Sequence, residues 1–146
     1  MGLFDKILGV DRSQPFGPHE GLAGILLGAS ACDGHIADEE VQSLFTMLGR
    51  MKMYSRYSEN QWSQLMNRLL GTLKRKGVDE LLGASVKALP AELRHTAFAN
   101  AVDIVLADGV VEDDEKEFID KLQSQLEIGG DEAMTIVKVM VVKNKG

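Results

Sequence analysis

Two short acidic stretches of this sequence match each other at a distance of 75 positions. An Asp-Gly pair begins at Asp33 and again at Asp108, and a glutamate follows each aspartate after seven residues, at Glu40 and Glu115. Four carboxylates that met in one small volume would repel one another, which favours a bound cation. Calcium suits such oxygen ligands best, with magnesium as the alternative ion. The residue types therefore predict a divalent-cation site made by both stretches.

Other side chains near these acids are additional candidate ligands. Asp38 and Asp113 precede the two glutamates, and His35 lies within the first stretch, where it is either a ligand or an exposed turn residue. Asp103 stands alone in an apolar run five residues before Asp108. Because an unpaired buried carboxylate is costly, we expect Asp103 either to face solvent or to lend an oxygen to the cation.

The same acids have a purely structural interpretation. The glycine after each aspartate is typical of a helix end, and a new helix would then begin close behind it. With Ala37 and Glu112 as N-caps, Glu40 and Glu115 occupy the N3 position, where a carboxylate can accept a hydrogen bond from the free N-cap amide. Helix caps with a docking surface for a partner protein thus remain an alternative to the cation site.

Apolar periodicity shows which elements must position these residues. Spacings of three and four residues predict an all-α, single-domain bundle of about seven helices. Each acidic stretch connects two of them, so the chain contains two helix–acidic turn–helix units, at about 18–75 and 90–143. The helices are expected near residues 18–31, 41–51, 59–76, 78–89, 93–106, 118–126 and 133–142.

Local signals mark several helix boundaries. Pro18 is placed to open a helix at its first position, Ser58 with Gln61 forms a capping box, and Gly77 is a stop. The glycines of the first helix predict a close approach to a neighbouring helix. Residues 133–142 are rich in Val and Ile, but no second strand exists to pair with them, so we expect a closing helix.

Composition and terminal patterns narrow the functional classes. A net charge of −6 disfavours nucleic acid as a partner, and a single cysteine fits a reducing compartment such as the cytoplasm. We expect no membrane span and no secretory signal, because no apolar run approaches the required length. The apolar residues of segment 3–8 share one helical face, and docking on the bundle is favoured over membrane contact.

Catalysis finds little support in the residue pattern. His19, His35 and His95 are dispersed, and no nucleophile and base can be paired by spacing. Zinc is disfavoured because the acidic stretches offer oxygens, while Cys32 suits a small buried side chain. A metal-dependent hydrolase would need an open coordination position and a general base that the sequence does not identify. We therefore expect a protein that is not an enzyme.

Three segments together resemble the TerB family of tellurite-resistance proteins. They are MGLFDKILG at residues 1–9, DGHIADEE at 33–40 and LADGVVEDDEKEF at 106–118. The resemblance extends from Leu3 to about Leu126 and depends on the duplication as well as on the opening residues. Ala37 departs from the family pattern, in which Ser is common as the N-cap.

The resemblance carries its own expectations. It implies two inverted helical repeats and a divalent-metal site, for calcium, at the turn aspartates Asp33 and Asp108 and the following glutamates Glu40 and Glu115. It also implies a role in resistance to tellurite and related stress, exerted through other proteins that include membrane-bound components. The protein would then act in the cytoplasm or at the inner face of the membrane. The oligomeric state is not indicated.

Overall fold

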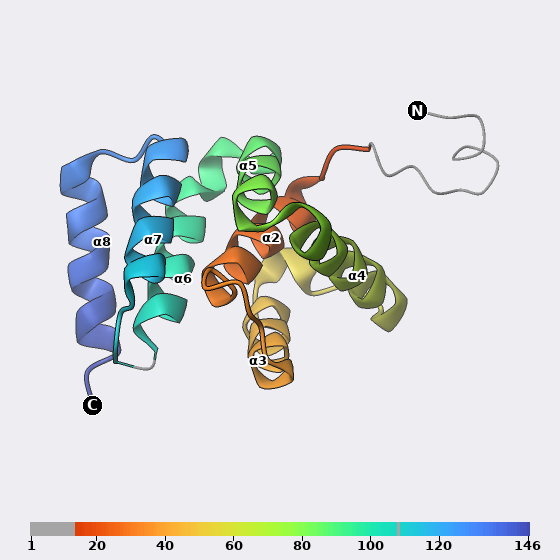
Figure 1. Cartoon of the computed structure of the whole chain (residues 1–146), viewed down its shortest axis with the longest axis horizontal. Helices are drawn as coiled ribbons and strands as arrows, with labels where there is room; N and C mark the ends of the chain where they lie inside the picture. The colour runs from red at the N-terminus through yellow and green to blue at the C-terminus, as the bar shows by residue number, and fades with distance from the viewer. Residues whose placement is uncertain (1–13, 108) are drawn as a thin grey trace.

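The structure, a computed structural model, describes residues 14–107 and 109–146, and the apolar segment 3–8 lies outside them. Most of the described residues are helical and none is in a strand, which confirms the predicted all-α fold class. In chain order the elements are α2 (Pro18–Ser30), α3 (Asp38–Gly49), η1 (Lys52–Tyr54), α4 (Glu59–Lys76), α5 (Val78–Ala88), η2 (Ala91–Leu93), α6 (Arg94–Leu106), α7 (Asp113–Gln125) and α8 (Gly130–Lys143) (Figure 1).

Helix α2 forms the centre of the bundle and packs against α3, α4, α5, α6 and α7 (Figure 1). It begins at Pro18, as predicted, and residues 21–29 are all buried. A helix whose whole circumference is apolar or glycine has no face that favours solvent, so it becomes the core around which the others pack. All the buried apolar residues of the described chain except Ala31 accordingly form one cluster.

Glycine lets α5 approach α2 closely. A β-carbon on Gly24 would lie only 2.0 Å from the hydroxyl oxygen of Ser85 on α5. That hydroxyl is fully buried and has no hydrogen-bond partner among the described residues. The close approach expected from the small residues of α2 is therefore confirmed, and it leaves one polar atom without compensation.

The remaining helices divide into two groups on either side of α2. Helix α6 packs on α2 and also contacts α7 and α8, so these three helices form one edge of the molecule (Figure 1). Helix α3 packs chiefly against α2 and against η1 at its own end. Because α3 and α6 both lean on α2 without packing extensively on each other, a space remains between them.

The predicted caps and the closing helix are confirmed. The Ser58 hydroxyl accepts a hydrogen bond from the Gln61 amide at 3.2 Å, and the Gln61 side chain accepts one from the Ser58 amide at 2.9 Å. Gly77 ends α4 with a φ of +89°. The Val-rich run after residue 130 is helix α8. Helices lie on both sides of each acidic stretch, while the division of the chain into two inverted repeats stays a prediction.

An aromatic cluster fixes the connection from α3 to α4. The Tyr54 hydroxyl donates a hydrogen bond to the His19 carbonyl oxygen at 2.6 Å, and burial raises the pKa of Tyr54 well above its usual value. Trp62 is half-buried and stacks on Tyr54 with ring centroids 5.3 Å apart. The His19 ring stacks on Tyr57, so this histidine contributes to the packing of the aromatic cluster.

None of the described helices combines the length and apolar character that crossing a membrane requires.

Candidate functional site

The first acidic turn is held by its own polar groups. Gly34 has a φ of +92°, a conformation that glycine adopts without strain. A carboxylate oxygen of Asp33 accepts a hydrogen bond from the His35 amide at 2.9 Å, which closes a short local turn. Glu40 accepts one from the Ala37 amide at 3.0 Å, as its predicted N3 position requires. Asp33, His35 and Glu40 all remain exposed.

The second acidic turn repeats the main features of the first. Gly109 has a φ of +81°, and Glu115 accepts a hydrogen bond from the Glu112 amide at 2.9 Å. The capping interpretation is thus confirmed for both glutamates. In both turns the N-cap side chain makes no hydrogen bond of its own, so only the N3 half of a capping box forms. Asp108, the other predicted ligand here, lies outside the described residues.

Two observations show that the turns are neighbours. Burial and then the negative charges of Glu115 and Asp33 together raise the pKa of the Cys32 thiol to about 11. A carboxylate from each unit therefore acts on one thiol. In addition, Glu40 and Glu115 both line a cavity of about 500 Å³. Acids far apart in the sequence are thus brought to one side of the molecule.

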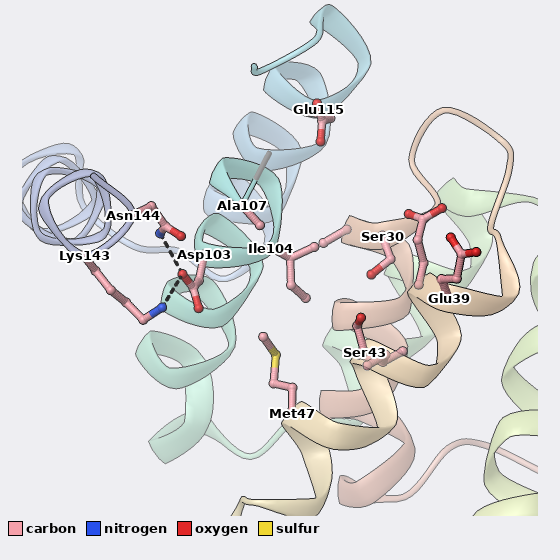
Figure 2. Close-up of a pocket in the computed structure, with 13 residues that line it drawn as sticks. Ser30, Glu39, Ser43, Met47, Asp103, Ile104, Ala107, Glu115, Lys143 and Asn144 are labelled. Carbon is pink, nitrogen blue, oxygen red and sulfur yellow. Dashed lines mark hydrogen bonds and ion pairs between the residues drawn. The ribbon is translucent and has the colours of Figure 1, made fainter. Parts of the chain in front are cut away.

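This cavity is part of a longer groove between α3 and α6. It adjoins a second cavity of about 660 Å³, and Ser43, Met47, Asp103 and Lys143 line both. We call the joined cavities the α3–α6 groove. Figure 2 shows Met47 and Ile104 pointing into the space from opposite walls. The groove therefore has apolar side chains inside and polar or charged ones along its edges.

Asp103 is paired with residues from the end of α8. Its side chain is only 16% exposed, and one carboxylate oxygen accepts hydrogen bonds from Lys143 at 3.1 Å and from Asn144 at 2.8 Å (Figure 2). It thus neither stands free in solvent nor turns an uncompensated charge toward the acidic turns. Both partners come from the end of α8, far away in sequence, and a contribution of Asp103 to a bound cation stays a prediction.

The four-acid cation site stays a prediction. Within residues 14–107 and 109–146, no three His, Cys, Asp or Glu side chains converge as metal ligands. Since Asp108 is not among these residues, the set of Asp33, Glu40, Asp108 and Glu115 is not tested as a whole. What the turns do provide is a pair of glutamates in a shared cavity, each also engaged with a backbone amide.

The secondary candidates are positioned mainly by helix starts. Asp38 and Asp113 are the first residues of α3 and α7, exposed where the helix dipole favours negative charge. His35 is exposed in the first turn. Cys32 is half-buried rather than fully buried, and its thiol donates to the Ala29 carbonyl oxygen at 3.5 Å. A thiol with a raised pKa is a poor zinc ligand and a poor nucleophile.

Sequence reasoning missed the residues that make the groove. The apolar spacing predicted a helix near residues 41–51, but Ser43 and Met47 were not singled out. Only Leu44 and Leu48 of α3 are in fact buried, whereas Met47 and Met51 are half-buried and face the groove cavities. Met47 lies three residues after Leu44 and four before Met51. This spacing places the three side chains on one face of the helix, and it could have identified Met47 as part of that face.

No family model matches this chain, and no curated protein or solved structure is significantly similar to it.

Proposed function

We propose that this protein is a non-catalytic adaptor that binds a helical segment of a partner protein in the α3–α6 groove. The observation that supports this is the groove itself, two adjoining cavities of about 500 and 660 Å³ beside a helix that buries only two of its residues. An amphipathic helix laid in such a groove would bury the apolar side chains that α3 leaves partly uncovered.

The groove interior suits an apolar helix face. Met47, Met51 and Ile104 are half-buried and line its cavities. Methionine is flexible and polarisable, so it adapts to partners of different shape and is frequent at helix-binding surfaces. Leu44 is buried and also lines the cavity, so it forms a rigid part of the groove floor.

The groove rim indicates the charge of the partner. Glu39, Glu40 and Glu115 line the cavity at the acidic turns, where the cation Lys143 is paired with Asp103, while Arg50 lines the other end of the groove. With a net charge of −6 for the whole chain, the rim should attract a helix that carries Lys or Arg beside its apolar face. This proposal corresponds to the alternative predicted from the sequence, in which the acidic turns act as helix caps and as a docking surface for a partner protein.

A pair of synthetic peptides tests the proposal. One is an amphipathic helix of Leu and Lys of about 14 residues, roughly the mean helix length in proteins, and the other replaces Lys by Glu. We expect the Lys peptide to bind at least about tenfold more tightly in calorimetry, a difference of about 1.4 kcal/mol, and its binding to weaken with salt.

Matched serine variants place the binding in the groove. Ser43→Arg adds bulk and positive charge inside the groove, whereas Ser63→Arg makes the same change at an exposed position of α4. Both serines are exposed, so neither change should alter stability by more than about 0.5 kcal/mol. We expect only Ser43→Arg to abolish binding. Equal losses in both variants, or no preference for the Lys peptide, would contradict the proposal.

A divalent cation between the turns is a second candidate function, supported by the shared cavity of Glu40 and Glu115. An ion there would relieve repulsion between the turns and change the surface that a partner meets. Calorimetric titration of calcium and magnesium is the test, with Asp33→Asn combined with Asp108→Asn as one variant and Glu40→Gln combined with Glu115→Gln as the other. Binding that survives both double changes would reject the site.

The resemblance to TerB proteins supports a cellular setting for this adaptor. We place it in resistance to tellurite and related stress, at the cytoplasmic side of membrane-bound partners. Deletion of the gene should then increase sensitivity to tellurite, and Ser43→Arg should fail to restore resistance where Ser63→Arg succeeds. Unchanged sensitivity after deletion would remove this setting but would leave the peptide result untouched.

A further inference from the structure

Helix α8 carries an unusual concentration of exposed apolar side chains. Among the described residues, four of the five large hydrophobic side chains that are exposed belong to α8: Met134, Val139, Val141 and Val142. Met134 is 56% exposed and Val142 is 71% exposed. The helix lies at the edge of the bundle, where it packs on α6 and buries only Ala133 completely (Figure 1). Such a patch on one helix indicates an interaction surface.

The outward charges of α8 are arranged with opposite signs at its two ends. Asp131 is exposed in the first turn, while Lys138 is exposed in the middle and Lys145 just beyond the last turn. The other two charged residues near the ends already have partners in the bundle. Glu132 lies 2.6 Å from His95, and Lys143 lies 3.1 Å from Asp103.

We propose that this face of α8 binds the same face of a second copy of the chain, with the two helices antiparallel. Asp131, Met134, Lys138 and Val142 follow one another at three or four residues and therefore share one side of the helix. A twofold axis near Lys138 would place Asp131 opposite Lys145 of the second copy, since each lies seven residues from the axis. Met134 would lie opposite Val142 in the same way, and symmetry makes each pairing twice.

The charge pattern favours a second copy over a lipid surface. A helix that lies on an anionic membrane carries Lys or Arg along its polar edges, whereas α8 presents Asp131 on the same face as its valines, and the whole chain has a net charge of −6. Short branched valines also give up little conformational freedom when they pack against another helix. Antiparallel pairing in addition sets the acidic first turn of one helix beside the basic end of the other.

Lys138 gives the proposal an internal check. It lies near the axis, where two copies of one cation would face each other and weaken the association. Replacement of Lys138 by Leu should therefore tighten the dimer, because it removes the repulsion between the two lysines and buries two leucine side chains. A gain of about 1.4 kcal/mol in the free energy of association corresponds to roughly tenfold tighter binding. A purely structural role for α8 in its own bundle gives no reason for such a gain, because Lys138 is exposed there.

Charge reversal supplies the decisive experiment, read by sedimentation equilibrium on the full chain. In a dimer of the Asp131→Lys variant, the new lysine of each copy would lie opposite Lys145 of the other copy. In a dimer of the Lys145→Asp variant, the new aspartate of each copy would lie opposite Asp131 of the other copy. We expect each alone to associate at least about fivefold more weakly than the wild type, because two exposed ion pairs become two repulsive contacts. Mixed in equal amounts, the two variants regain opposite charges at both contacts and should form the heterodimer.

The controls keep the outcomes distinct. Glu59→Lys makes an acid-to-lysine change at an exposed position of α4, and it should associate like the wild type. Circular dichroism confirms that each variant is folded. A wild type that remains monomeric up to about 1 mM overturns the proposal, whether or not it binds added phosphatidylserine vesicles. An equal mixture of the two variants that forms no heterodimer overturns it as well. Tighter association of Lys138→Leu together with rescue in the mixture supports it.

Discussion

The ring of Phe118 on α7 lies directly against Gly28 on α2, where a β-carbon would be only 2.9 Å from the aromatic Cε1 atom. Gly28 precedes the first acidic turn by five residues, and Phe118 follows Glu115 by three. This contact therefore helps to set the start of α7 beside the end of α2. A larger residue at position 28 would push the Phe118 ring away and so separate the two acidic turns.

Gly28→Ala should destabilise the protein by about 1–3 kcal/mol, because the added methyl group overpacks a fully buried aromatic contact. The higher helix propensity of alanine offsets about 1 kcal/mol of that loss. Gly83→Ala is the matched control, since Gly83 is in α5 with nothing within 4 Å of a β-carbon. The control should be stabilised by about 0.5–1 kcal/mol. Urea denaturation of both variants makes the comparison, and equal effects would contradict it.

Ser85→Ala should leave the protein as stable as before or up to about 1 kcal/mol more stable. The buried Ser85 hydroxyl has no partner among the described residues, so its removal costs no hydrogen bond and relieves an unsatisfied polar atom. The packing against Gly24 involves the β-carbon as well, which alanine retains. Thermal unfolding measures the change, and a loss above about 1 kcal/mol would show that the hydroxyl has a native partner.

Much of this fold could be predicted because local signals agreed with the apolar period. Pro18, the Ser58 cap and the Gly77 stop each act within a few residues, and each appears where the sequence indicated. The closing helix at residues 130–143 was ambiguous in its composition, and the absence of a partner strand decided it correctly. The deep burial of Tyr54 was not anticipated, because it depends on the His19 carbonyl 35 residues away.

The site could be predicted only at the level of its two turns. The capping roles of Glu40 and Glu115 follow from spacing within one turn of helix. The α3–α6 groove does not, because it exists where two helices lean on a third without touching much of each other. Asp103 shows the same limit. Its environment is set by Lys143 and Asn144 from the other end of the second unit, which no periodicity connects to it.

Asp103→Ala should weaken the attachment of α8 to α6 and lower stability by about 1–3 kcal/mol, the usual range for hydrogen bonds to a charged group. The carboxylate is 16% exposed and accepts from both Lys143 and Asn144, so its loss removes both hydrogen bonds and leaves the Asn144 amide with only the Met140 carbonyl oxygen. Hydrogen exchange should accelerate in the last turns of α8 before the rest of the bundle. Asp120→Ala, at an exposed position of α7, is the control and should change neither quantity.

Cys32 should react slowly with iodoacetamide, and its rate should continue to rise between pH 9 and pH 11. With a pKa of about 11 the thiol is almost fully protonated at pH 9 and only about half ionised at pH 11, whereas a cysteine with the ordinary value of 9.0 is largely ionised by pH 10. Glu115→Gln removes one of the charges that raise this pKa, so the curve should shift to lower pH. Glu59→Gln, on α4, should not shift it. A wild-type rate that levels off by about pH 10 would contradict the assignment.

The same thiol can report on the proposed cation. Cys32 is the only cysteine in the chain, and Glu115 and Asp33 both raise its pKa, so an ion bound between the turns would oppose their charges and lower that pKa. Calcium should then speed the alkylation of Cys32 at pH 9 in a saturable manner, while sodium at equal ionic strength should produce only a small screening effect. The Glu40→Gln and Glu115→Gln double variant should start faster and show no saturable response. Wild-type protein whose rate is the same in calcium and in sodium would eliminate the cation as a function of these turns, and the groove would then retain its acidic rim solely for a basic partner helix.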